Sequence, residues 1–119
     1  MRTPAMKQKP TVWTLEAALE VIRAIQPLVR EFGYHVALGG GVLNKGESRK
    51  DLDLYFLSLD NPKTPADASR LTRWLDATWG KGTPIGDDDY DTDKDVVYAE
   101  KNTYTSQGRR IDVFVIGGE

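Results

Sequence analysis

The segment 52–59 constrains the fold most, because it combines strong β-propensity with two carboxylates at its start. Asp51 and Asp53 flank Leu52, and the two-residue period of a strand places both on one face, about 6.5–7 Å apart at their Cα atoms. Two such carboxylates repel each other unless a cation lies between them, and magnesium prefers hard oxygen ligands. The pattern predicts a strand that begins at a cation site, with a solvated strand start as the alternative.

A third carboxylate, Asp112, interrupts the apolar pattern of a second predicted strand at 110–116. The Asp112 carboxylate lies on the same strand face as apolar residues, so its charge needs a compensating partner. If this strand lies beside 52–59, the three carboxylates converge. Such a set can hold two metal ions, about 3.5–4 Å apart, that assist in-line attack at phosphorus. The alternative is a salt bridge to one of the nearby cations Arg49, Arg109 and Arg110.

A run of three glycines, Gly39, Gly40 and Gly41, precedes the first of these strands. Residues without a Cβ let backbone N–H groups approach a phosphate closely. A glycine triplet is by itself more often a turn than a ligand loop. Its position before a short basic spacer and the Asp-Leu-Asp strand makes it a candidate cradle for a triphosphate.

Residues 14–33 carry the three-and-four spacing of an amphipathic helix. Thr14 is the expected N-cap and Gly33 the expected C-terminal stop. Pro27 predicts a kink or break near 24–26, because its ring removes one backbone hydrogen bond. The apolar positions of this helix are Leu15, Ala18, Leu19, Ile22, Ile25, Val29 and Phe32.

The remaining pattern predicts strands and one further helix. The segments are a strand at 34–38, a helix at 65–79, a loop at 80–86, and a hairpin of 96–104 and 110–116 around a turn at 105–108. Together they predict an α+β fold with a small mixed, mostly antiparallel sheet flanked by helices.

Length and composition limit the classes of protein. With 119 residues we expect one domain at 14–119, preceded by a polar arm at 1–13. The absence of cysteine excludes disulfide scaffolds, thiol catalysis and cysteine-ligated zinc, and the single histidine, His35, excludes any site that needs two. No apolar run is long enough for a membrane span or a signal peptide, so we expect a cytoplasmic protein without a membrane partner.

The segment 87–95 holds six aspartates and one lysine, within a chain of net charge −2. Its alternating aspartates resemble the first ligands of an EF-hand calcium loop. However, Thr92 stands where that loop needs glycine, and Tyr98 stands where it needs a bidentate glutamate. A solvated or substrate-gating acidic loop is the better interpretation.

Two segments, LGGGVLNKGESRKDLDLYF at 38–56 and RRIDVFV at 109–115, resemble the DNA polymerase β-like nucleotidyltransferases. The glycine form is similar to that of the abortive-infection-type nucleotidyltransferase toxins of toxin–antitoxin systems, whereas the minimal, antitoxin-type enzymes usually show Gly-Ser. The resemblance implies a nucleotidyltransferase core with Gly39, Gly40 and Gly41 as the phosphate-binding turn. It also implies two Mg²⁺ ions, or Mn²⁺ in their place, on the catalytic ligands Asp51, Asp53 and Asp112.

The resemblance further implies transfer of a nucleoside monophosphate from a nucleoside triphosphate such as ATP to an acceptor hydroxyl, with release of pyrophosphate. The acceptor could be RNA or tRNA, a protein or a small molecule. The expected triphosphate contacts are Ser48, Arg49, Lys50, Arg109 and Arg110. The chain ends before the C-terminal helical part of many relatives, so we expect a homodimer or a partner protein to complete the site.

A protein that does not catalyse is the alternative: a module of the same fold that acts as an inhibitor, an antitoxin-like partner or a regulatory subunit. The presence of all three carboxylates favours an enzyme, because a domain without catalysis has no need to keep a repulsive acidic triad.

Overall fold

The computed structural model describes residues 13–48, 50–58, 65–85 and 98–116. In chain order its elements are β1 (Trp13–Thr14), α2 (Leu15–Glu31), β2 (Tyr34–Gly39), α3 (Gly40–Lys45), β3 (Glu47–Ser48), β4 (Asp51–Ser58), α4 (Pro65–Trp79), β5 (Thr83–Pro84), β6 (Tyr98–Ser106) and β7 (Arg109–Ile116). The polar arm up to residue 12, Arg49 and the acidic segment 87–95 lie outside the described residues. None of the helices in the described part of the chain is long and apolar enough to cross a membrane.

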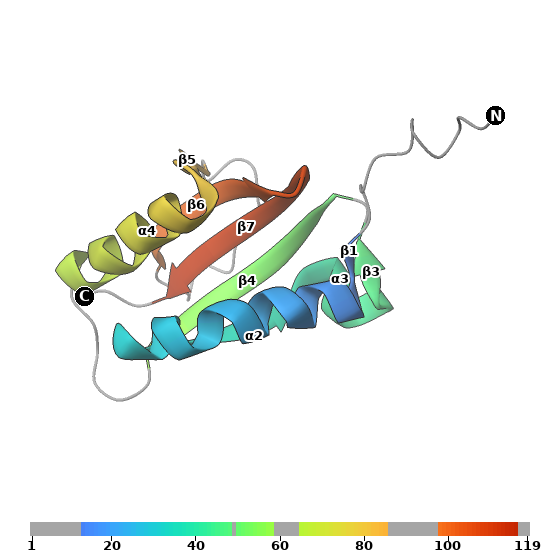
Figure 1. The fold of residues 1–119 in the computed structure, drawn as a ribbon, viewed down its shortest axis with the longest axis horizontal. Coiled ribbons are helices and arrows are strands. Elements are labelled where there is room, and N and C mark those ends of the chain that lie inside the picture. The colour runs from blue at the N-terminus through green and yellow to red at the C-terminus, as the bar shows by residue number, and fades with distance from the viewer. Residues whose placement is uncertain (1–12, 49, 59–64, 86–97, 117–119) are drawn as a thin grey trace.

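The main sheet has five strands in the order β2, β4, β7, β6, β5 (Figure 1). Strands β4 and β7 are parallel, and the other neighbouring pairs are antiparallel. The predicted α+β class, with a mixed and mostly antiparallel sheet flanked by helices, is confirmed. The parallel pair lies at the centre of the sheet, so β4 and β7 are hydrogen-bonded on both sides.

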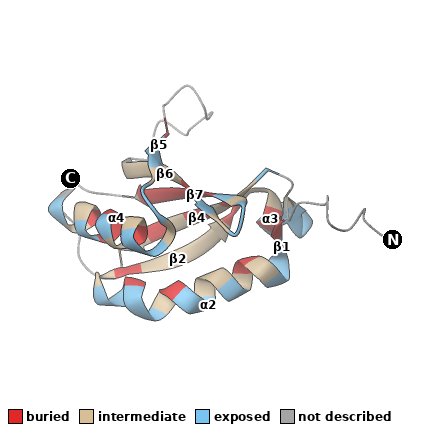
Figure 2. Cartoon of the chain, turned by 45° about the horizontal axis from the view of Figure 1, so that its top comes forward, coloured by how far each residue is buried: buried red, intermediate tan, exposed pale blue. Residues whose placement is uncertain are grey.

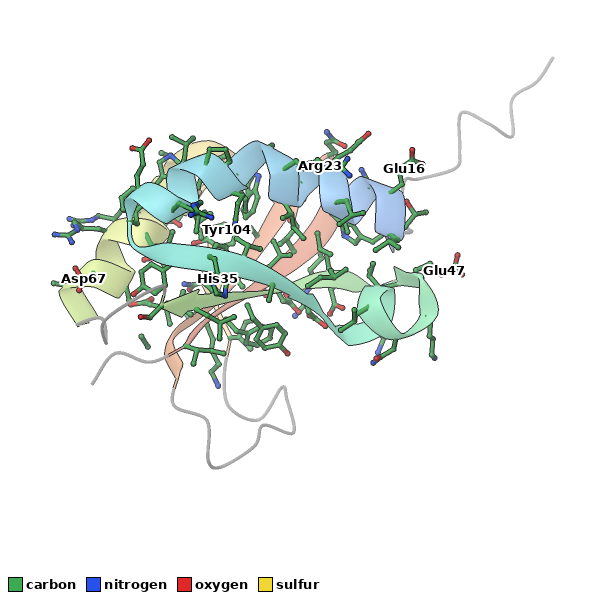
Figure 3. The ribbon with its side chains drawn as sticks, turned by 90° about the horizontal axis from the view of Figure 1, so that it is seen from below. Glu16, Arg23, His35, Glu47, Asp67 and Tyr104 are labelled. Atoms are coloured by element: carbon green, nitrogen blue, oxygen red, sulfur yellow. The ribbon has the colours of Figure 1, made fainter. Side chains whose placement is uncertain are left out.

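The two long helices, α2 and α4, lie on the same side of this sheet (Figure 3). Alternate residues of β4 and β7 point toward them, and Figure 2 shows buried residues on both helices and along β7. The core between these layers includes Ala18, Ile25, Val29, Leu52, Leu54, Phe56, Leu71, Leu75, Ile111, Val113 and Val115. The other set of alternate positions on β4 and β7, which carries the aspartates, faces the opposite side.

Helix α2 begins and ends where the sequence predicts. The Thr14 side chain accepts a hydrogen bond from the backbone N–H of Ala17, and Gly33 follows the helix with a positive φ of 87°. A kink or break was predicted near 24–26, and the break is wrong, because the helix runs without interruption for 17 residues. Pro27 has no backbone N–H to donate to the carbonyl of Arg23. Both residues lie on the exposed side of the helix, where water can bond to that carbonyl. Leu15, predicted on the apolar face, is 44% exposed.

The other predicted elements differ from the structure mainly at their ends. Helix α4 has the predicted bounds, and β2 is one residue longer than predicted. The glycine run, expected as a phosphate-binding turn, leads into the short helix α3, and β1 pairs with β3 in a small second sheet. The hairpin turn is shorter than predicted, because only Gln107 and Gly108 lie between β6 and β7. Both have positive φ values, 56° and 76°, as a tight two-residue hairpin requires.

Candidate metal centre

The strand register brings the three predicted carboxylates together. Asp53 on β4 lies opposite Asp112 on β7, and Asp51 lies two residues before Asp53 on the same face of β4. Each of the three offers a carboxylate oxygen, and these oxygens all lie within 4.8 Å of one another. Sequence spacing therefore accounts for two of the three carboxylates, and the parallel pairing of β4 with β7 adds the third.

Asp112 is fully buried and is held by two donors. Thr103 on β6 lies opposite it in the antiparallel register, and the Thr103 hydroxyl donates to Oδ1 of Asp112 at 2.8 Å. Nε of Arg110 donates to the same oxygen, also at 2.8 Å, in an ion pair. Arg110, predicted as a triphosphate contact, is thus also the salt-bridge partner named in the alternative interpretation. Thr103 was missed, because its place opposite Asp112 depends on the exact position of the hairpin turn.

Asp53 has a different environment from Asp112. Its Oδ1 is buried and has no hydrogen-bond partner among the described residues. Burial, and to a smaller extent the nearby charge of Asp51, raise the pKa of Asp53 from 3.8 to about 6, and the charge of Arg110 opposes this rise. An unpartnered, partly desolvated carboxylate next to two others is costly in the absence of a counter-charge. This observation fits a site for a hard divalent cation.

The glycine run packs directly against the carboxylates. Gly39 lies opposite Asp53 in the pairing of β2 with β4. A Cβ at Gly39 would overlap the Tyr55 ring, and one at Gly40 would overlap Oδ2 of Asp53. Gly40 also has a φ of 67°, a backbone conformation that residues other than glycine rarely adopt. The first two glycines are therefore required by close packing at the site, whereas a Cβ at Gly41 would meet Ser48 at an ordinary 3.4 Å.

The other predicted phosphate contacts have mixed outcomes. Oγ of Ser48 accepts hydrogen bonds from the backbone N–H groups of Lys50 and Asp51, both at 3.2 Å, so this side chain shapes the start of β4. Lys50 is exposed beside it. A hollow of ≈ 370 Å³ next to the glycine turn is lined by Gly41, Lys45, Glu47 and Ser48. Lys45 was not singled out in the sequence, and its place in the hollow follows from helix α3.

Arg109 lies on the opposite face of the sheet from the carboxylates. Its guanidinium carbon is 4.1 Å from the centre of the Trp13 ring, and its Nη2 donates to Gln107 at 2.8 Å. The indole N–H of Trp13 in turn donates to the backbone carbonyl of Arg110 at 2.8 Å. The structure does not bring Arg109 to the carboxylates, and it gives Trp13 a structural role at the start of β7.

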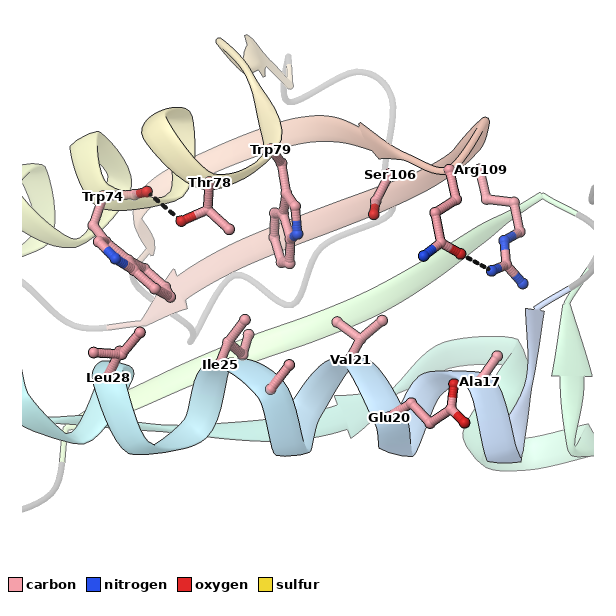
Figure 4. A pocket seen from close by; sticks show the side chains of 12 residues that line it. Ala17, Glu20, Val21, Ile25, Leu28, Trp74, Thr78, Trp79, Ser106 and Arg109 are labelled. Carbon is pink, nitrogen blue, oxygen red and sulfur yellow. Dashed lines mark hydrogen bonds between the residues drawn. The ribbon is translucent and has the colours of Figure 1, made fainter.

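A larger pocket, ≈ 410 Å³, lies between α2 and α4 on that same opposite face (Figure 4). Its walls include Ile25 and Leu28 from α2 and Trp74 and Trp79 from α4. The two tryptophans also pack against neighbours, with Trp74 near Phe32 and the Trp79 ring edge-on to the Tyr104 ring. The sheet separates this pocket from the carboxylates, so the pocket and the candidate metal centre are different places.

Comparison with protein-family models and with curated protein sequences gives no match. The resemblance to nucleotidyltransferases therefore remains a prediction from the motifs. The geometry of the carboxylates is independent of that resemblance.

Proposed function

We propose that this protein is a metal-dependent nucleotidyltransferase that moves a nucleoside monophosphate from a nucleoside triphosphate to an acceptor hydroxyl. One observation supports this proposal above all others: parallel pairing brings Asp112 next to Asp53 and Asp51, directly beside the Gly39–Gly40 turn. A structural ion pair alone needs only one carboxylate. Three carboxylates beside a glycine turn, one of them with a buried oxygen that lacks a partner among the described residues, fit a cation and a phosphate.

The three aspartates would hold the metal, and Mg²⁺ fits their hard oxygen atoms, with Mn²⁺ as an alternative. Divalent ions bound there would lower the pKa of the attacking hydroxyl and stabilise the charge on the leaving pyrophosphate. Thr103, which donates to Asp112, would position this carboxylate for the role, and the Asp53 carboxylate packs against Gly40.

The transfer forms a bond between the acceptor oxygen and the α-phosphorus and breaks the bond from the α-phosphorus to the oxygen that bridges to the β-phosphorus. The hydroxyl proton leaves to water. We expect the glycine turn to bind the triphosphate through its backbone, with Lys50 and Arg110 providing positive charge. The acceptor is an RNA, a protein or a small molecule.

A module without catalysis is the second candidate, and one observation favours it. Arg110 and Thr103 already satisfy an oxygen of the buried Asp112, so this carboxylate is stabilised by the chain itself. A regulatory or antitoxin-like partner would have no further need of a metal. The two candidates differ in whether Asp53 is required for ligand binding, since Asp53 takes no part in that ion pair.

Thermal unfolding with each of the four ribonucleoside triphosphates, with and without Mg²⁺, tests the proposal. A ligand present at 100 times its Kd stabilises the folded state by about 2.7 kcal/mol, enough to raise Tm by several degrees. The shift should require both Mg²⁺ and Asp53, and it should be lost in Asp53→Asn. The control is Glu31→Gln, which removes one negative charge from an exposed position at the end of α2.

Activity is then measured as pyrophosphate release and as transfer of label from an α-³²P nucleotide to candidate acceptors. The proposal expects both to be lost in Asp53→Asn and kept in Glu31→Gln. Full activity of Asp53→Asn would overturn it. The absence of any shift with all four triphosphates would favour the second candidate.

A further inference from the structure

We propose that Arg110 is an internal counter-ion that competes with the divalent cation for Asp112, so that it restrains metal binding at this site. The inference rests on the proposed metal centre and adds a regulating residue to it. It predicts that removal of the Arg110 charge tightens metal binding, which is the opposite of what loss of an ordinary supporting residue does.

The geometry assigns this role to Arg110. Its Nε lies 2.8 Å from Oδ1 of Asp112, and Asp51 is its register partner on β4. The guanidinium is thus a cation at the carboxylate cluster itself. The Arg110 side chain is 47% exposed, whereas the Asp112 side chain is fully buried. Arg110 can therefore move toward solvent while Asp112 stays in place.

Electrostatics makes the guanidinium and a metal ion alternatives. Arginine stays charged at all ordinary pH values, so it cannot yield the site by losing a proton. Two cations a few ångströms apart have a large repulsion energy, even where the effective dielectric constant is about 20. A metal ion that binds Asp112 must therefore either displace the guanidinium or bind more weakly beside it. A displaced guanidinium at this position would be available for a substrate phosphate.

Thr103 provides an internal comparison. Its hydroxyl donates to the same Oδ1 at the same 2.8 Å, but it is neutral and does not repel a cation. We therefore assign Thr103 as a positioning residue for Asp112. Loss of either donor removes one hydrogen bond from Asp112, but only loss of Arg110 removes a competing charge.

The experiment measures Mn²⁺ binding to the full chain without nucleotide, from the electron paramagnetic resonance signal of free Mn²⁺. Arg110→Gln should bind Mn²⁺ about tenfold more tightly than the wild-type protein, a modest gain because the guanidinium is partly exposed to solvent. Arg110→Lys keeps the charge and should bind with an affinity close to that of the wild type. Thr103→Val should bind no more tightly than the wild type.

The matched control is Arg23→Gln, the same substitution at an exposed position of α2, on the other side of the sheet (Figure 3). It changes the net charge equally and should leave the Mn²⁺ affinity unchanged. Equal tightening in Arg23→Gln or Thr103→Val would overturn the proposal. The proposal would also be overturned if Arg110→Gln bound Mn²⁺ no more tightly than the wild type.

A second measurement uses only the wild-type protein and does not depend on the folding of any variant. The Nε–Hε resonance of Arg110, assigned by ¹⁵N NMR, should shift and exchange faster with solvent on saturation with Mg²⁺, because its carboxylate acceptor is taken. An unchanged resonance at saturation would overturn the proposal, because the guanidinium would then not respond to a metal ion at Asp112. If the wild type binds Mn²⁺ and Asp53→Asn does not, but Arg110→Gln binds no more tightly than the wild type, the inference alone fails. If Mn²⁺ binding does not depend on Asp53, the proposed function fails together with the inference.

Discussion

Asp53 and Asp112 lie directly opposite each other in the parallel pair β4 and β7, but of these two only Asp112 forms an ion pair among the described residues, with Arg110. Asp112 accepts from Arg110 and Thr103, whereas Oδ1 of Asp53 is buried without a hydrogen-bond partner among the described residues. The two carboxylates therefore differ in their effect on stability. Asp53 destabilises the folded state when it is charged and has no cation, and this cost is measurable.

Asp53→Asn should stabilise the metal-free protein at pH 8. The folded-state pKa of about 6 exceeds the ordinary 3.8, so the folded protein binds the proton more tightly than the unfolded chain does. The contribution of Asp53 to stability therefore falls as pH rises from about 4 to 6 and stays low above that range. The pKa difference corresponds to at most about 3 kcal/mol, and solvent screening reduces the expected gain to about 1–2 kcal/mol.

Urea denaturation at a series of pH values in the presence of a chelator checks this prediction. The wild-type protein should approach the stability of Asp53→Asn as pH is lowered toward 4, since its carboxyl group then becomes neutral. Mg²⁺ should stabilise the wild type and not the variant. A variant less stable than the wild type at pH 8 would show that Asp53 has a favourable partner.

Gly40→Ala should lower the free energy of unfolding by about 2–4 kcal/mol. The new Cβ would overlap Oδ2 of Asp53, and the φ of 67° is unfavourable for alanine. Gly41→Ala is the matched control, because its Cβ would meet Ser48 at 3.4 Å and alanine favours helix α3. We expect a change within about 1 kcal/mol for Gly41→Ala. Equal costs at the two positions would contradict the close packing of Gly40 on Asp53.

Trp13→Phe should destabilise the protein by about 1–3 kcal/mol. The indole is 1% exposed and donates to the carbonyl of Arg110, and phenylalanine would fill most of the space but leave that carbonyl without its donor. Chemical denaturation measures the loss. A variant as stable as the wild type would show that the hydrogen bond contributes little.

Pro27→Ala should stabilise the protein by about 1–2 kcal/mol. Alanine restores the N–H that can donate to the carbonyl of Arg23, and it has a higher helix propensity. The gain is less than the full helix penalty of proline, because proline also restricts the unfolded chain. The change in Tm measures it, with Ala24→Gly as a control that should destabilise the same helix. A lower Tm for Pro27→Ala would indicate that the proline ring packs favourably.

Local patterns in the sequence account for most of the elements. The cap at Thr14, the stop at Gly33 and the bounds of α4 follow from short-range chemistry, and all agree with the structure. The differences occur where the surroundings of a segment in the folded protein decide the outcome. Helix α2 continues through Pro27 because that side faces solvent, and the glycine run enters helix α3 beside Asp53.

The candidate site shows the same division. Strand periodicity predicts that Asp51 and Asp53 share a face, since this depends only on the backbone period. Thr103 could have been found from the hairpin if the turn had been placed at Gln107 and Gly108, because the antiparallel register then follows by counting. The predicted turn at 105–108 would have placed a different residue opposite Asp112.

Neighbours a few residues apart account for the bounds of α2 and α4, the main strands and the apolar side of each of these strands. The tertiary fold was needed to place β7 parallel to β4, in the register that joins Asp112 to Asp53. It also decided that Arg110 turns to Asp112 while Arg109 packs on Trp13. The physical reason is that pairing between strands more than 50 residues apart is set by how the helices and the whole sheet pack.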